Sequence, residues 1–228
     1  MYVERPPTAG LADRVACEWR QVSEADTTQL VVPDACVDLI WGPEGLFVAG
    51  PDTGPMPTPM AAGDTFVGIR FKPGAAGDFF GLPLQELRDQ RVRLSDLPPL
   101  HVPDAPPSRR LDALRAAVRA RLAQGTSADP ASFAIAGALR NGRTVGEVAW
   151  DLGFSERQLH RRSLASFGYA PKTLQRIVRF QRALTLARAG VPLAEVALAA
   201  GYADQAHLSH DVKRLSGVSM RHLVSLSG

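Results

Sequence analysis

The C-terminal part of the chain contains one sequence pattern twice. The first copy starts at Thr144 and the second at Pro192. In both copies Glu-Val-Ala is followed, four residues after its alanine, by a glycine and an aromatic residue, at 153–154 and at 201–202. Further along each copy, a leucine and a glycine stand nine residues apart. Two copies are too few for a solenoid, so the pattern predicts a pair of similar supersecondary units.

Each copy has the physical features of a helix-turn-helix unit. A short first helix would place its apolar residues inward at helical spacing. Gly153 and Gly201 come directly after it, and glycine tolerates the positive φ that a tight turn requires. Ser155 and Asp204 can cap the second helix by accepting hydrogen bonds from its free N–H groups. The second helix of such a unit is the one that enters the major groove of DNA.

The outward side of each second helix carries side chains suited to base recognition. Arginine forms a bidentate pair with guanine, and glutamine does the same with adenine. The less basic face of the second unit is expected to read sequence more loosely, and a solvated surface is the alternative interpretation of any single residue. The candidate contacts are Arg157, Gln158, His160, Arg161 and Arg162 in the first unit, and Gln205, Ala206, His207, Ser209 and His210 in the second.

A long helix over about 171–189 is expected to join the two units. Pro171 stands at its first turn, where proline is well tolerated. Its basic residues can contact phosphates, which position a protein on DNA without specifying sequence. They are Lys172, Arg176, Arg179 and Arg182.

The two parts of the chain carry opposite charge. From residue 131 onward there are 13 Lys and Arg against 6 Asp and Glu, whereas residues 1–130 hold 13 against 17. Such an asymmetry indicates that one part meets a polyanion. An apolar fraction of 45% and a charged fraction of 21% are typical of a soluble globular protein. Because no apolar run is long enough to span a membrane and no signal pattern is present, we expect a cytoplasmic protein without membrane contact.

The N-terminal part has the pattern of a small antiparallel sheet or barrel with short helices, which makes the whole chain α+β. The expected strands are 14–22, 29–33, 36–41, 46–49 and 65–72. The segment 50–59, with four prolines, is expected to be a turn region. Short helical stretches are expected at 75–80, 84–89 and 94–97.

A further helix is expected from an N-cap at Ser108 to about residue 124, with Gly125 as its stop. Its apolar stripe either packs on the sheet or forms a dimer contact. The expected organisation is a β-rich regulatory domain over 1–107, a helix and linker over 108–130, of which 125–130 is the linker, and a DNA-binding domain over 131–228.

The segment from 131 to about 226 resembles the DNA-binding domain of the AraC/XylS family of bacterial transcription regulators. The resemblance lies in Val148-Ala149…Leu152-Gly153-Phe154-Ser155…Leu159-His160-Arg161, in 201–208 and in 213–223. It implies a sequence-specific DNA-binding regulator whose linker helix holds the two recognition helices about one DNA turn apart. His210 departs from the family's usual arginine, and Val212 from its usual aromatic residue. The implied base contacts are Arg157, His160, Arg161, Gln205, Ala206 or His207, and His210.

The N-terminal domain of this family commonly binds a small effector, mediates dimerisation, or does both. The segments 32–41 and 68–76 resemble a short N-terminal domain of some bacterial members. Candidate ligand-lining residues are Asp38, Trp41, Arg70 and Phe71. Strand alternation places Asp38 on the face opposite Trp41, so a structural role is the alternative for Trp41, and an ion pair with Asp38 is the alternative for Arg70.

No enzyme motif is present: the chain lacks Gly-x-Ser-x-Gly, a phosphate-binding glycine loop and His-Glu-x-x-His. The two cysteines form no disulfide framework and no Cys/His pair has zinc-ligand spacing, so neither a metal nor a cofactor is expected. The alternative function is a thiol-based stress sensor or methyl acceptor that uses Cys36 with the same DNA-binding domain. It requires a nearby cation to lower the pKa of that thiol.

Overall fold

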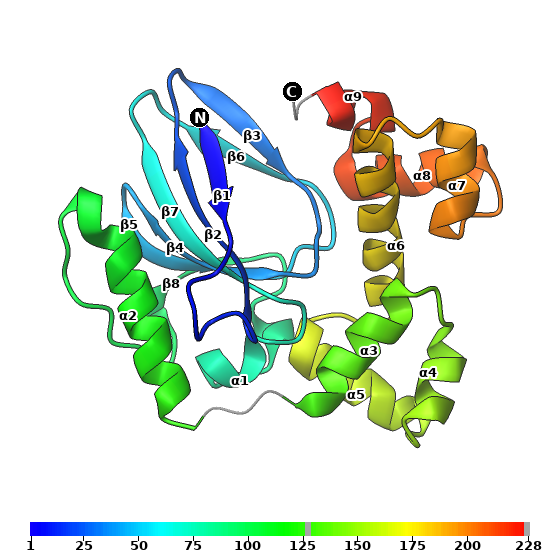
Figure 1. The fold of residues 1–228 in the computed structure, drawn as a ribbon, viewed down its shortest axis with the longest axis horizontal. Coiled ribbons are helices and arrows are strands. Elements are labelled where there is room, and N and C mark those ends of the chain that lie inside the picture. The colour runs from blue at the N-terminus through cyan, green and yellow to red at the C-terminus, as the bar shows by residue number, and fades with distance from the viewer. Residues whose placement is uncertain (126–128, 226–228) are drawn as a thin grey trace.

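The computed structural model describes residues 1–125 and 129–225 and has a β-rich N-terminal part and a helical C-terminal part (Figure 1). The N-terminal part is built on a six-stranded antiparallel sheet with the order β1-β2-β7-β4-β5-β8. This confirms the expected antiparallel sheet and the α+β class. The strands are β1 (Tyr2–Arg5), β2 (Val15–Val22), β4 (Val37–Gly42), β5 (Gly45–Ala49), β7 (Thr65–Phe71) and β8 (Arg91–Arg93).

A two-stranded ribbon of β3 (Thr27–Val31) and β6 (Met56–Met60) extends beside this sheet (Figure 1). The expectation that the whole of 50–59 is a turn region is therefore wrong. Pro57 pairs with Leu30 and Pro59 with Thr28. A proline has no N–H to donate in a hydrogen bond between strands. Pro57 and Pro59 are two residues apart and so occupy equivalent positions of β6, where the backbone N–H would point away from β3. β1 and β8, at the two edges of the large sheet, were also not expected.

Helix α2 (Arg110–Ala123) packs against β7 on one face of the sheet. Leu114 and Val118 are fully buried in the N-terminal core, so the apolar stripe of this helix packs on the sheet. The N-cap predicted at Ser108 is wrong, because Ser108 lies inside a 3-10 turn, η3 (Pro107–Arg109), that precedes the helix. Proline is favoured in the first helical turn, and Pro107 starts the turn before Ser108 can act as a cap.

Short helical segments complete the N-terminal part. They are α1 (Gly77–Phe80), η1 (Leu84–Glu86) and η2 (Leu94–Asp96), which confirms the three expected helical stretches with shorter bounds. Residues 126–128 of the linker expected at 125–130, and residues 226–228 at the end of the expected DNA-binding domain, lie outside the described residues.

The C-terminal part is helical and is organised around one long helix, α6, against which both helix-turn-helix units pack (Figure 1). The proline at the first turn of α6 and the expected bounds of this helix agree with the structure. Among the described residues, no helix is long and apolar enough to cross a membrane. The helices are α3 (Pro130–Arg140), α4 (Val145–Asp151), α5 (Glu156–Phe167), α6 (Pro171–Arg188), α7 (Leu193–Ala200), α8 (Gln205–Ser216) and α9 (Met220–Ser225).

The two parts are joined by polar contacts between buried groups. The hydroxyl of Tyr169, which is 1% exposed, donates a hydrogen bond of 2.7 Å to the backbone carbonyl of Asp52. The hydroxyl of Ser132 on α3 donates one of 2.9 Å to the carbonyl of Gly74. Ala35, from the segment before β4, is buried in the hydrophobic core of the helical part. The N-terminal part is therefore docked on the helical part through its loops and through α1 and η1, which contact α5, rather than linked to it only by the chain.

Candidate DNA-binding surface and ligand cavity

The first helix-turn-helix unit consists of α4, a glycine turn and α5. Thr144 and Glu147 form a capping box at the start of α4, with the Thr144 N–H donating to the Glu147 carboxylate across 2.7 Å. Gly153 has a φ of 66°, as a tight turn between two crossing helices requires. The Ser155 hydroxyl then accepts a hydrogen bond from the Gln158 N–H and caps α5. Local sequence alone thus fixes both helix starts and the turn between them.

The inner side of α5 is buried and its outer side is basic. Leu159 and Phe167 are 1% and 0% exposed in the helical core. Arg157, His160 and Arg161 are exposed and form no hydrogen bond or ion pair with any residue that the structure describes. Their donors are therefore available to an external partner.

Two of the predicted contacts on α5 have intramolecular partners. The side-chain oxygen of Gln158 accepts a hydrogen bond of 2.8 Å from the Ser155 N–H, which makes Gln158 part of the helix cap. The guanidinium of Arg162 forms an ion pair with Asp129 and lies 4.7 Å from the centre of the Phe154 ring. Because Arg162 points toward the start of α3, it stabilises the unit rather than extending the free basic face.

The second unit repeats this geometry with different contacts. Gly201 has a φ of 85°, and the Asp204 carboxylate caps α8 by accepting a hydrogen bond of 2.7 Å from the His207 N–H. The exposed side of α8 carries Gln205, Ala206, His207, Ser209 and His210. This face carries no arginine or lysine in its first two turns, in agreement with its less basic sequence.

Two of the expected phosphate-contacting residues of α6 are held by α8. Asp211 is buried, and its carboxylate is 2.8 Å from the guanidinium of Arg179 and 3.6 Å from that of Arg176. Arg179 also lies 4.1 Å from the centre of the ring of Tyr202, and burial raises the pKa of that tyrosine to about 12. Lys172 and Arg182 are exposed on the same helix. Arg176 and Arg179 therefore tie the second unit to α6.

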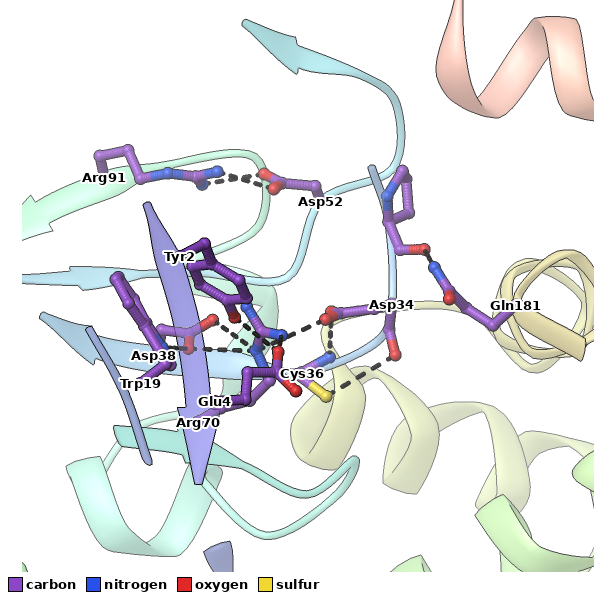
Figure 2. Close-up of polar contacts among 11 residues, drawn as sticks. Tyr2, Glu4, Trp19, Asp34, Cys36, Asp38, Asp52, Arg70, Arg91 and Gln181 are labelled. Atoms are coloured by element: carbon purple, nitrogen blue, oxygen red, sulfur yellow. Dashed lines mark hydrogen bonds and ion pairs between the residues drawn. The ribbon is translucent and has the colours of Figure 1, made fainter. Parts of the chain in front are cut away.

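A cavity of about 290 Å³ lies between the sheet, the β3–β6 ribbon and α6. At its acidic side the guanidinium of Arg70 faces three carboxylates (Figure 2). Its Nε atom is 3.2 Å from Asp38 and 3.7 Å from Asp34, and its Nη1 atom is 3.3 Å from Glu4. The indole N–H of Trp19 donates a hydrogen bond of 2.7 Å to Asp38. Burial raises the pKa of Asp38, Arg70 opposes that rise, and Asp34 adds to it.

Of the four predicted ligand-lining residues, the structure brings Asp38 and Arg70 to the cavity, and they form the ion pair that was the alternative interpretation of Arg70. Trp41 and Phe71 are not there. Both are buried in the core between the sheet and α2, because side chains alternate between the two faces of a strand. Other residues that line the cavity come from segments that are distant from one another in sequence. They are Tyr2, Trp19, Gln21, Gln29, Phe47, Thr58, Met60, Phe66, Gln181, Leu184 and Arg188.

The cysteines have no thiolate-stabilising environment. Burial raises the pKa of the Cys36 thiol, and the Asp34 carboxylate adds to that rise, while Arg70 only partly opposes it. Burial likewise raises the pKa of Cys17 to about 11. Since a reactive thiol needs a lowered pKa, the surroundings of Cys36 do not favour a thiol-based sensor.

Comparison with known families agrees with this geometry. Residues 148–225, which contain both recognition helices, match a family described as a helix-turn-helix domain. The C-terminal domain is of the AraC type. Such domains occur in DNA-binding transcription regulators, a class that is not enzymatic. Residues 3–93 match a second family, described as a domain of unknown function (DUF6597). The AraC-type domain therefore follows a separate N-terminal domain.

Solved structures share the whole arrangement at low sequence identity. The crystal structure of ToxT from Vibrio cholerae O395 has a TM-score of 0.51 and 10% identity, covering 92% of this chain and 97% of ToxT. An apo form of a ToxT variant from Vibrio cholerae strain SCE256 has a TM-score of 0.50 and 11% identity, covering 91% and 97%. A search of curated proteins gave no match. At this identity the likeness shows a common fold of the AraC-type domain and its N-terminal partner.

Proposed function

We propose that this AraC-type protein is a sequence-specific transcription regulator that reads two successive major-groove segments with α5 and α8. The observation that carries the proposal is the outer face of α5. Arg157, His160 and Arg161 are exposed there without intramolecular partners among the described residues, while the opposite side of the helix is buried in the core. Unengaged arginines on the second helix of a helix-turn-helix unit are suited to base contacts.

The second recognition helix is proposed to add a weaker contact. Gln205 and His207 lie in the first turn of α8, the end that enters the groove in such units. Ala206 and His210 complete the same outward face, and they offer apolar and imidazole contacts rather than a guanidinium. We expect α5 to contribute most of the sequence preference.

Phosphate contacts are proposed for Lys172 and Arg182, whose side chains are exposed on α6. Arg176 is engaged with Asp211, so its role in this proposal is to hold α8 on α6. A regulator of this kind acts where the bacterial chromosome lies, in the cytoplasm. The regulator is proposed to act as a homodimer in which the N-terminal domain forms the dimer contact.

The cavity is proposed to be the site of a small effector. It is lined both by the sheet and by Gln181, Leu184 and Arg188 of α6, the helix that connects the two recognition units. Pockets at domain interfaces commonly bind small molecules. A molecule bound there would contact the sheet and the connecting helix together, and so could change how the two units are held.

The test is fluorescence anisotropy with labelled fragments from upstream of the protein's own gene, measured at several salt concentrations. We expect saturable binding that prefers one fragment and weakens steeply with salt, because phosphate contacts release counterions. Arg161→Ala should lose the preference and at least about tenfold in affinity. Arg93→Ala, which removes the same charge from an exposed side chain of β8, is the matched control and should bind as the unchanged protein does. Equal, weak binding of all fragments by all three proteins would contradict the proposal.

A further inference from the structure

The charges that line the cavity do not balance at its sheet side. Arg70 is the cation there, and Glu4, Asp34 and Asp38 all lie within 3.7 Å of its guanidinium. One guanidinium neutralises one carboxylate charge, so two remain. The side chains of Arg70 and Asp38 are 24% and 13% exposed, which limits screening by water. The sheet side of the cavity therefore presents an excess of hydrogen-bond acceptors with negative charge.

The other two arginines that line the cavity form no ion pair with these three carboxylates among the described residues. Arg91 is held by two hydrogen bonds, of 2.9 and 2.7 Å, from its guanidinium to the carboxylate of Asp52 (Figure 2). Arg188 lines the cavity from α6, opposite the sheet, and Arg70 rather than Arg188 is the ion-pair partner of Glu4, Asp34 and Asp38 among the described residues. An anionic ligand at Arg70 would have to displace a carboxylate and then lie beside the two that remain.

Aromatic side chains form the walls next to these carboxylates. Tyr2 and Trp19 have ring centroids 5.9 Å apart, and Phe47 and Phe66 line the cavity from β5 and β7. The face of an aromatic ring attracts a cation within about 6 Å of its centroid. The Tyr2 hydroxyl donates a 2.5 Å hydrogen bond to Glu4, which fixes this wall to the acidic group. Aromatic faces beside unneutralised carboxylates are suited to an amine carried on an apolar body.

We propose that the cavity binds a small organic cation, with its ammonium or guanidinium group at Glu4, Asp34 and Asp38 and its apolar part against Trp19 and Phe66. This inference rests on the proposed function only in taking the cavity as the effector site. A volume of about 290 Å³ is at the lower end of ligand pockets, so the ligand is small. Gln181 and Gln29 supply neutral donors and acceptors for the remainder of the molecule.

The test uses three probes that share a phenylethyl group and differ in charge: 2-phenylethylamine, 2-phenylethanol and 3-phenylpropanoate. Each is titrated into the full chain by calorimetry at pH 7, without DNA. We expect the amine to bind at least about tenfold more tightly than the alcohol, and the carboxylate not to bind. Quenching of tryptophan fluorescence that disappears in Trp19→Phe places the probe in the cavity, since Trp41 lies in the core between the sheet and α2 and the exposed Trp150 lies on α4 of the helical part.

Two variants distinguish an effect of the acidic group on amine binding from a general effect of the protein's charge. Glu4→Gln should weaken amine binding about threefold to tenfold. Its side chain is 47% exposed, so the variant is expected to fold. Glu44→Gln, which removes an exposed carboxylate from the β4–β5 turn, is the matched control and should leave binding unchanged. Tighter binding of the carboxylate than of the amine, or no binding of any probe at millimolar concentration, would overturn the inference. DNA binding of the ligand-free chain is measured separately, so failure of the regulator proposal is distinguishable.

Discussion

The side-chain amide of Gln181 on α6 donates a hydrogen bond of 2.6 Å to the backbone carbonyl of Pro33 (Figure 2). The next residue, Asp34, points its carboxylate toward Arg70 in the cavity. Ala35 follows with a φ of 64°, which is uncommon for a residue with a Cβ, and its side chain is buried in the helical core. Three consecutive residues thus contact the connecting helix, the cavity and the core of the DNA-binding domain.

We expect Gln181→Leu to loosen this segment. The variant removes one hydrogen bond, and such a loss lowers the free energy of unfolding by about 1 kcal/mol. Hydrogen exchange measured by mass spectrometry should show faster exchange in a peptide that covers residues 32–38. Gln175→Leu is the control, because the Gln175 side chain bonds to Arg143 inside the C-terminal domain. Equal exchange of this peptide in both variants would show that Gln181 does not hold the segment.

The contact between the domains is expected to be sensitive at Gly168, the C-cap of α5. A Cβ at this position would lie 2.6 Å from the Pro51 ring and 3.0 Å from the Leu84 carbonyl, and φ is 76°. Gly153 has a similar φ of 66° with no atom within 4 Å of its would-be Cβ. Gly153→Ala should therefore cost about 1–2 kcal/mol of backbone strain alone. Gly168→Ala should cost at least about 2 kcal/mol more, from overpacking against the N-terminal domain.

Urea denaturation of the two glycine variants provides the measurement. Because the backbone strain is similar at both positions, the difference between the two losses reports the packing between domains. Equal losses would mean that the contact of Gly168 with Pro51 and Leu84 relaxes at no cost.

Neighbouring arginines of α5 should have separable roles. Arg161 is exposed without a described partner, whereas Arg162 pairs with Asp129 and lies over Phe154. We expect Arg161→Ala to lose sequence preference with little change in stability. Arg162→Ala should instead lower the free energy of unfolding by about 1 kcal/mol and keep the preference among fragments. Anisotropy and urea denaturation of both variants test this. If Arg162→Ala also lost the preference among fragments, Arg162 would belong to the face that contacts bases.

The helical domain was predictable from sequence because its determinants are local. The positive φ of Gly153 and of Gly201, and the caps at Ser155 and Asp204, each depend on residues within one or two turns. Because the sequence argument used only local patterns, it did not predict the ion-pair partners of Arg162 and Arg176. Asp129 lies 33 residues before Arg162, and Asp211 lies 35 residues after Arg176, so only the fold brings each pair together.

The cavity was predictable only in part, for the same reason. Asp38 and Arg70 were both predicted as lining residues, and the structure pairs them directly across the adjacent strands β4 and β7. The alternation of side chains along β4 placed Trp41 in the core. The aromatic wall was not predicted, because Tyr2 lies on an unexpected edge strand. Phe66 could have been found, since it lies on the expected strand 65–72 and alternation places it on the same face as Arg70. The α6 side of the cavity depends on how the domains dock, which no local pattern specifies.

The buried ion pair of Glu18 and Arg115 should give the stability of the protein a distinct pH dependence. Glu18 on β2 is 1% exposed, and its carboxylate accepts hydrogen bonds of 2.8 and 2.5 Å from the guanidinium of Arg115 on α2. The backbone N–H and hydroxyl of Thr8 donate two more, of 2.9 and 2.6 Å. Burial acts to raise the pKa of Glu18, but the hydrogen bonds from Arg115 and Thr8 outweigh it and lower that pKa below 4.5.

A carboxylate whose pKa is lowered by folding stabilises the protein above its ordinary pKa, and this contribution is lost as pH falls through the lowered value. The free energy of unfolding should therefore fall as pH drops below about 5. Glu18→Gln should cost about 2–3 kcal/mol at pH 7, because it leaves a desolvated guanidinium without its main partner, and should flatten the acid limb of the pH profile. Glu86→Gln, which changes an exposed carboxylate of η1, should lose little at pH 7 and keep the acid limb. Urea denaturation from pH 3.5 to 7 compares the three proteins, and parallel profiles for Glu18→Gln and the unchanged chain would assign the acid sensitivity to other carboxylates.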